Sequence, residues 1–177
     1  MKWLLLLGLL ASAEAFADEK LWKLLQAGGQ VILIRHTVTT PGAGDPPGFK
    51  LDDCSTQRNL SDEGRAHAQR ISKEFQSRKV MVGRVLSSPW CRCIETAKLA
   101  FGRVDDVSQP LSNLFGRPEN RDAQVKQLKE MTSYSVKENL VLVTHGSTIQ
   151  ALTGIAPGTG EMVVMTGGKV AGRLIVP

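Results

Sequence analysis

Val31-Ile32-Leu33-Ile34-Arg35-His36-Thr37 is a run of four apolar residues that ends in arginine, histidine and threonine. Four consecutive apolar residues, three of them β-branched, indicate a strand buried on both faces, as in a parallel sheet covered by helices. Val85-Leu86 and the stretch from Leu140 to Val143 have the same character. Ligands of open α/β sheets bind beyond the C-terminal ends of the strands, so we expect Arg35 and His36 at that edge.

Helical patterns lie between these strands. Residues 62–78 follow Ser61, a predicted N-cap, and place Ala66, Ile71 and Phe75 at helical spacing. We expect further helices from residue 89 or 90 to about 101 and from about 119 to 131. This alternation predicts the α/β class, as a three-layer sandwich with a mostly parallel central sheet and helices on both faces.

Two other segments fall outside this alternation of strands and helices. Residues 161–166 and 172–176 flank Gly167-Gly168, which predicts a terminal β-hairpin or edge pair. The stretch from Thr37 to about Leu60 is irregular and holds much of the glycine and proline. Loops of this length in compact domains are usually functional.

The length and composition indicate one globular domain, and the first residues indicate export. Residues 1–17 resemble a signal peptide, with basic Lys2, a short apolar run and an A-x-A pattern at Ala15 and Ala17. The run is too short to cross a bilayer, so after cleavage we expect residues 18–177 to form a single domain that is periplasmic or secreted and not inserted in the membrane.

Charge and cysteine content narrow the function further. The net charge of +5 suits an anionic substrate, but no clustered basic stripe indicates nucleic-acid binding. Cys54, Cys91 and Cys93 lack the spacing of a zinc site. In an oxidising compartment they could form one disulfide, with Cys54 bridged to Cys91 or Cys93, or remain three separate small core residues.

Three further residues are candidates for the same site. His145 follows an apolar strand that ends at Val143-Thr144, and His36 likewise follows an apolar strand, whereas His67 falls in a charged helix and is expected on the solvated surface. Arg92 lies in the first turn of a predicted helix, where a guanidinium adds to the N–H groups and dipole that favour phosphate. Arg58 is a possible further phosphate ligand or a residue that braces the loop.

The chain resembles the histidine phosphatase superfamily, in the phosphoglycerate-mutase-like branch that carries histidine-glycine at the second site. The resemblance rests on the motifs Arg35-His36-Thr37, Asn59-Leu60-Ser61 with Gly64-Arg65, Ser87 to Ala97, and Thr144-His145-Gly146. It implies that His36 attacks phosphorus while Arg35, Arg92 and His145 hold the phosphate oxygens. It also implies that no metal or other cofactor takes part.

The chain departs from the family pattern at two positions. Asn113 stands where many relatives carry a glutamate that protonates the leaving group. Either Glu119, Asp45 or Asp53 replaces that acid, or the leaving group needs little protonation, as in a phosphohistidine or an acyl or anhydride phosphate. Thr37 replaces a glycine, and its side chain would narrow the pocket or add a hydroxyl contact to substrate.

The sequence therefore predicts an exported phosphatase that forms a phosphohistidine on His36. Its partner would be a phosphorylated small molecule, an envelope glycan or a phosphohistidine. The alternative is a non-catalytic phosphate-binding or envelope-interaction protein on the same fold. A cofactor-dependent phosphoglycerate mutase is disfavoured because its substrate is cytoplasmic.

Overall fold

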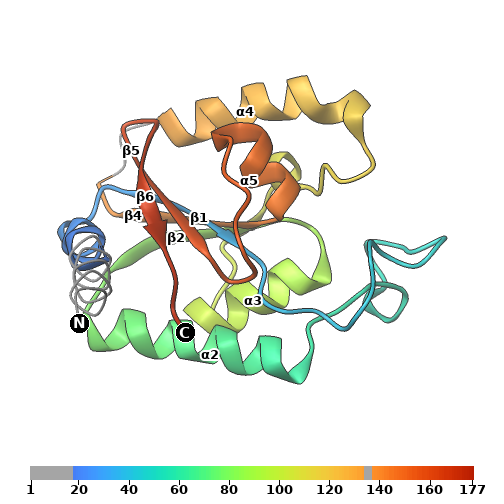
Figure 1. The fold of residues 1–177 in the computed structure, drawn as a ribbon, viewed down its shortest axis with the longest axis horizontal. Coiled ribbons are helices and arrows are strands. Elements are labelled where there is room, and N and C mark those ends of the chain that lie inside the picture. Colours follow the sequence, from blue (N-terminus) through green and yellow to red (C-terminus); the bar gives the residue numbers. More distant parts are fainter. Residues whose placement is uncertain (1–17, 134–136) are drawn as a thin grey trace, which may run out of the picture.

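The computed structural model describes residues 18–133 and 137–177, and within them a six-stranded sheet lies between two layers of helices (Figure 1). The predicted signal peptide lies outside the described residues. The strand order is β3-β2-β4-β1-β5-β6. In chain order the strands are β1 Val31–Arg35, β2 Val82–Ser87, β3 Asp106–Val107, β4 Asn139–Thr144, β5 Met162–Thr166 and β6 Lys169–Leu174.

The sheet is mostly parallel, as predicted. β1 pairs in parallel with β4, and β4 with β2, whereas β5 and β6 are antiparallel to their neighbours. Arg35 is opposite Thr144 in the register of β1 and β4. His36 and His145 are therefore the first residues beyond two adjacent strands that end at the same edge.

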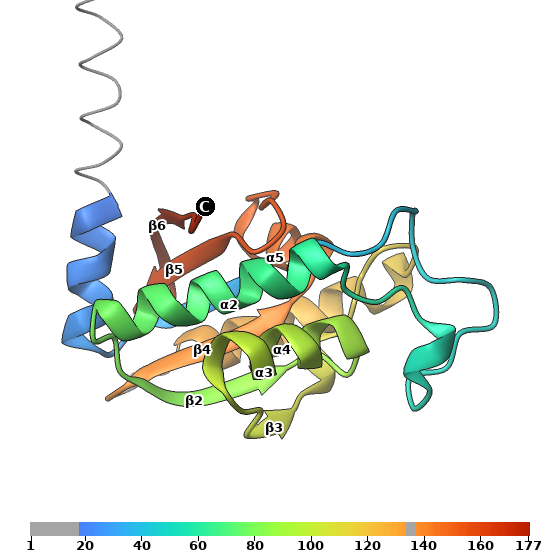
Figure 2. The same ribbon diagram turned by 90° about the horizontal axis from the view of Figure 1, so that it is seen from below.

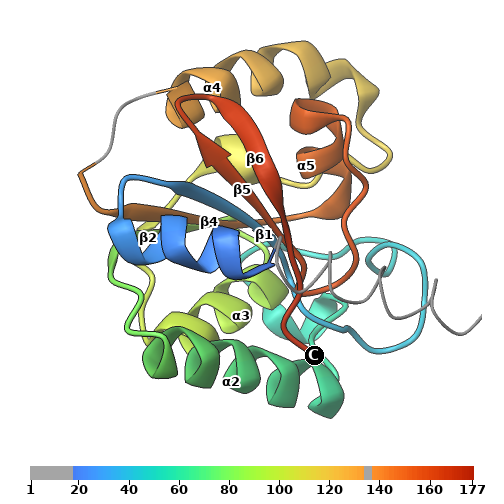
Figure 3. The same ribbon diagram turned by 60° about the vertical axis from the view of Figure 1, so that its left-hand side comes forward.

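The helices cover both faces of this sheet. Figures 1 and 3 show α2 and α3 on one face and α4 and α5 on the other, and Figure 2 shows α2 and α3 side by side. Residues 18–27 are also helical. The other helices are α2 Asp62–Ser77, α3 Cys91–Phe101, α4 Arg121–Ser133 and α5 Gly146–Thr153.

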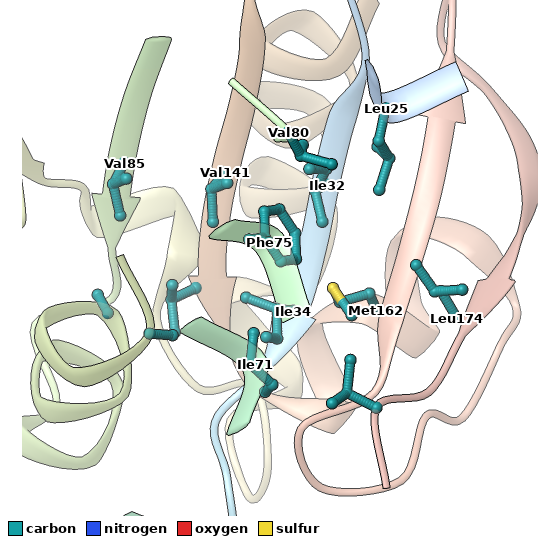
Figure 4. Packing of buried hydrophobic residues seen from close by; sticks show 14 of the residues in the cluster. Leu25, Ile32, Ile34, Ile71, Phe75, Val80, Val85, Val141, Met162 and Leu174 are labelled. Carbon is teal, nitrogen blue, oxygen red and sulfur yellow. The ribbon is translucent and has the colours of Figure 1, made fainter. Parts of the chain in front are cut away.

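Strand β1 contributes side chains to two hydrophobic cores, one on each face of the sheet. Ile32 and Ile34 pack into the cluster on the α2 and α3 side, which also contains Phe75 (Figure 4). Val31 and Leu33 belong to a second cluster, with Leu128 and Ile149 of the opposite helices. Alternate residues of a strand point to opposite faces, so four consecutive apolar residues fill two cores at once.

Several expectations need correction. His67 is buried, and its Nε2 donates to the Val176 carbonyl oxygen at 2.8 Å, so this histidine fastens the C-terminal segment rather than facing solvent. Ala66 is exposed, and Ala68 occupies the buried face of α2 instead. The hairpin is confirmed, with positive φ at Gly167 and Gly168, but its second strand begins at Lys169.

The long segment between β1 and α2 is fastened to the start of α3. Cys54 forms a disulfide with Cys91, and Cys93 is a buried free thiol. Gln57 Oε1 accepts a hydrogen bond from the Cys91 backbone N–H at 3.0 Å. Because Trp90, the N-cap residue, makes no side-chain capping bond, Gln57 supplies one from the loop.

The described helices include none long and apolar enough to cross a membrane.

The chain that leaves β1 also packs tightly on α2. The Ser61 N–H donates to the Val38 carbonyl oxygen at 3.1 Å, and the Ser61 side chain caps the helix at Gly64 N–H. A Cβ on Gly64 would lie 1.9 Å from that carbonyl oxygen. The close approach therefore requires glycine at this position.

We expect Gly64→Ala to lower the free energy of unfolding by about 1–3 kcal/mol because the added methyl group must displace the Val38 backbone. Helix propensity alone would change stability by about 1 kcal/mol in the opposite direction. Urea denaturation measures the change, and Ala66→Gly, at an exposed position of the same helix, reports propensity alone. A Gly64→Ala protein as stable as the parent would contradict the packing.

Candidate functional site

His36 is held with one ring nitrogen free. Its side chain is buried, and Nδ1 lies 2.9 Å from the Thr37 carbonyl oxygen. A carbonyl can only accept, so Nδ1 carries the proton and Nε2 keeps its lone pair in the neutral ring. Burial, only partly offset by the Thr37 hydrogen bond and reinforced by the charge of Arg92, lowers the pKa of His36 to about 3. The imidazole is therefore neutral at physiological pH.

His145 is the N-cap residue of α5 and faces His36, with the ring centroids 5.5 Å apart. Its Nε2 lies 2.7 Å from Ser88 Oγ, whereas Nδ1 is buried without a partner in the part of the chain that the structure describes. Burial is the main reason that its pKa lies well below the usual value, and the positive charge of Arg92 lowers it further. Nδ1 is thus the nitrogen available to a ligand.

Arg35 is the last residue of β1 and borders both histidines. Its Nη1 donates to the Pro157 carbonyl oxygen at 2.8 Å, and its Nε is buried without a partner among the described residues. A Cβ on Gly146 would lie 3.3 Å from Arg35 Cδ and Nε. The glycine after His145 therefore leaves the space that this guanidinium occupies.

Arg92, the second residue of α3, is 1% exposed and forms an ion pair with Asp45, whose side chain is 4% exposed. Burial alone would raise the pKa of Asp45, but the hydrogen bond and charge of Arg92 lower it below its usual value. Asp45 is therefore ionised and its oxygens are occupied. This corrects its candidacy as the proton donor.

Arg58 lies in the same loop as Asp45, and its side chain reaches the same site as Arg92. Its Nη1 donates to Thr39 Oγ1 and to the Gly42 carbonyl oxygen, each at 2.8 Å, and its Nε has no partner among the described residues. Burial and the charge of Arg92 lower the pKa of both Arg58 and Arg35, although guanidinium groups stay protonated in proteins.

These side chains surround one cavity of about 400 Å³. Its walls contain no aspartate or glutamate from residues 18–133 or 137–177. The lining residues are Arg35, His36, Gly42, Ala43, Gly44, Arg58, Arg92, Asn113, Phe115, His145, Gly146, Ser147, Gln150, Ala156 and Pro157.

The unpaired polar atoms indicate what the cavity binds. Five buried side-chain nitrogen or oxygen atoms in the described residues have no hydrogen-bond partner, and four of them belong to the cavity: Nε of Arg35, Arg58 and Arg92, and Nδ1 of His145. Buried polar groups are normally paired, so four unpaired nitrogens around one space indicate a site for an anion that accepts several hydrogen bonds.

Three further candidate site residues do not line the cavity. The Thr37 side chain lies 3.4 Å from Thr96 Oγ1 and is fully buried, so it packs against α3 and makes no substrate contact. Thr37 acts instead through its carbonyl, which orients His36. Glu119 is exposed in the 3-10 helix Pro118–Asn120, outside the cavity lining. Asp53 is exposed and its Oδ1 accepts from Ser55, so it serves a local turn.

Other functional contacts had no clear sequence signal. Ser88 orients His145, and Ser147 fixes Asn113, but single serines near strand ends are too common to single out. No group of three or more His, Cys, Asp or Glu side chains in the described ranges could hold a metal ion. The expectation that no metal takes part stays a prediction.

Comparison with known proteins gives a family and a fold. The family model described as the Histidine phosphatase superfamily (branch 1) matches residues 31–114, which include His36, Arg58 and Arg92. No curated protein sequence matches the chain.

Solved structures share the fold. The protein histidine phosphatase SixA complexed with tungstate has a TM-score of 0.59 and 16% identity, over 82% of this chain and 96% of that chain. The putative phosphohistidine phosphatase SixA from Agrobacterium tumefaciens has a TM-score of 0.59 and 20% identity, over 84% and 99%. Phosphoserine phosphatase from Entamoeba histolytica, in complex with 3-phosphoglyceric acid, has a TM-score of 0.56 and 13% identity, over 76% and 89%.

At these low sequence identities, the similarity to the solved structures shows the fold alone. The family match, in contrast, covers the motifs around His36 and Arg92. The sheet order and the position of His36 after the central strand agree with that match. Residues 31–114, which carry His36 and Arg92, therefore match branch 1 of the histidine phosphatase superfamily, and the rest of the chain completes the fold that the solved structures share.

Proposed function

We propose that the protein is an exported phosphatase that hydrolyses a phosphomonoester or phosphoramidate through a phosphohistidine on His36. The observation that carries the proposal is the free Nε2 of His36 beside a cavity with four unpaired buried nitrogens. Nucleophile and anion site therefore occur together, as covalent phosphoryl transfer requires.

The reaction has two steps. His36 Nε2 donates its lone pair to phosphorus, and the bond from phosphorus to the leaving group breaks with its electron pair on that group. Arg35, Arg58 and Arg92 stabilise the charge on the phosphoryl oxygens. Water then attacks phosphorus, the N–P bond breaks, and neutral His36 and inorganic phosphate are released.

The walls of the cavity indicate which leaving groups suit it. Asn113 Oδ1 accepts from Ser147 Oγ at 2.8 Å and from the Phe115 N–H at 3.1 Å, so only its amide N–H groups can face a substrate. An amide donates hydrogen bonds but no proton. We therefore favour a phosphohistidine, which is a phosphoramidate, over a phosphorylated envelope glycan, whose alcohol needs a proton to leave. The phosphohistidine phosphatases among the similar structures support this choice.

Export is proposed on two grounds. Residues 1–17 have the pattern of a signal peptide, and Cys54 and Cys91 form a disulfide. Stable disulfides are rare in reducing compartments, so the pair suits the periplasm or the extracellular space.

The histidines can be tested separately with the mature protein and p-nitrophenyl phosphate. We expect His36→Ala to abolish turnover because the nucleophile is lost, and His145→Ala to lower kcat by about 100-fold or more because one oxyanion donor is lost. His67→Gln is the matched control, since His67 lies outside the cavity, and should keep its kcat. Phosphate binding without turnover in the parent would favour the non-catalytic alternative.

The leaving-group preference gives a second test. With a series of aryl and alkyl phosphates, we expect the parent rate to fall steeply as the pKa of the leaving group rises, because no carboxylate of the described residues lines the cavity. Asn113→Glu should raise the rate on an alkyl phosphate at least about tenfold at mildly acidic pH. Asn113→Gln has the same length without an acid and should not. A shallow dependence in the parent would show that an acid is present and contradict the assignment.

A further inference from the structure

We propose that Asp45 is a positioning residue that orients Arg92 toward the bound phosphate and sets the charge of the site. The inference rests on the proposed phosphatase function. It differs from a role as acid or as substrate ligand, because Asp45 touches Arg92 rather than lining the cavity.

The carboxylate of Asp45 is fully occupied by donors from two elements. Oδ1 accepts from Arg92 Nη1 at 2.7 Å and from the Arg58 backbone N–H at 3.1 Å. Oδ2 accepts from Arg92 Nη2 at 3.3 Å and from Trp90 Nε1 at 3.0 Å. Two oxygens that engage both terminal nitrogens fix the plane of a guanidinium, as one contact could not.

This arrangement leaves one side of Arg92 for a ligand. Its terminal nitrogens are bound to Asp45, but Nε is buried with no partner among the described residues. The Arg92 side chain is 1% exposed, so the surrounding residues restrict its movement. Asp45 thus holds the group in place before phosphate arrives.

Asp45 also adjusts the charge of the site. Arg35, Arg58 and Arg92 together with Asp45 carry a formal charge of +2, and His36 and His145 have lowered pKa values and are neutral. That charge matches a phosphate dianion. Without Asp45 the site would attract phosphate more strongly and hold Arg92 less firmly. Stronger binding of substrate and product alike does not raise kcat, whereas misplacement of a charged group lowers it.

The loop between β1 and α2 holds Asp45 in position through contacts made by residues closer to α2. The Cys54–Cys91 disulfide and the Gln57 side chain connect the loop to the residue just before Arg92. Gly44, with φ of +71°, turns the chain immediately before Asp45. The same loop carries Arg58, so its placement orders two of the three arginines together.

The test compares Asp45→Asn with Asp53→Asn, a matched control at an exposed carboxylate of the same loop. Turnover of p-nitrophenyl phosphate is divided by the fraction of protein molecules that can be phosphorylated on His36. Binding of inorganic phosphate is measured by calorimetry. For Asp45→Asn we expect kcat to fall about 10- to 100-fold while inorganic phosphate binds several-fold more tightly. Asp53→Asn should match the parent in both.

A purely structural ion pair would give a different result: fewer folded molecules, with unchanged phosphate affinity and unchanged kcat per active site. That outcome would overturn the proposal. If Asp45→Asn does not fold, Trp90→Phe removes the indole donor to Asp45, together with part of the ring that packs edge-on against His145, and should lower kcat in the same direction. An unaltered kcat in Trp90→Phe would then overturn it.

Failure of the proposed function is recognised separately. It would appear as a parent protein without turnover on any phosphate. Calorimetry with inorganic phosphate needs no turnover, so the effect of Asp45→Asn on affinity still tests the role of Asp45. Unchanged affinity in that case would also overturn the inference.

Discussion

The parallel pairing of β1 with β4 is the constraint on which the rest of the site depends. Arg35 is opposite Thr144, so the residues that follow, His36 and His145, leave adjacent strands at the same level. The pairing is maintained by two cores, because the alternating side chains of β1 pack against helices on both faces. A shift of register by one residue would exchange these faces, so the fold specifies the position of the histidines.

Burial gives the site its chemical character. Arginine and histidine nitrogens that would be hydrated at the surface lie in a cavity without partners among the described residues. The same burial lowers the pKa of His36 to about 3 and leaves its ring neutral and nucleophilic. Leaving polar groups unpaired reduces stability, and sites that bind or react are where proteins retain such groups.

Sequence patterns predicted the fold class, the main strands and the convergence of Arg35, His36, Arg92 and His145, because runs of apolar residues and strand ends are local signals. They failed where tertiary contacts decide. His67 has the neighbours of a surface residue but meets the C-terminal segment, and Asp45 pairs with an arginine 47 positions away. The helix α5 was not predicted because its short sequence follows directly on the His145 motif.

In the proposed reaction, His36 attacks phosphorus through Nε2. Rapid quenching of the mature protein during turnover, followed by peptide mapping and NMR of the phosphorylated residue, tests this step. Because Nδ1 donates to the Thr37 carbonyl, we expect an acid-labile phosphate on Nε2 of His36. Phosphate on Nδ1 of His36, on His145, or on no histidine during active turnover would contradict it.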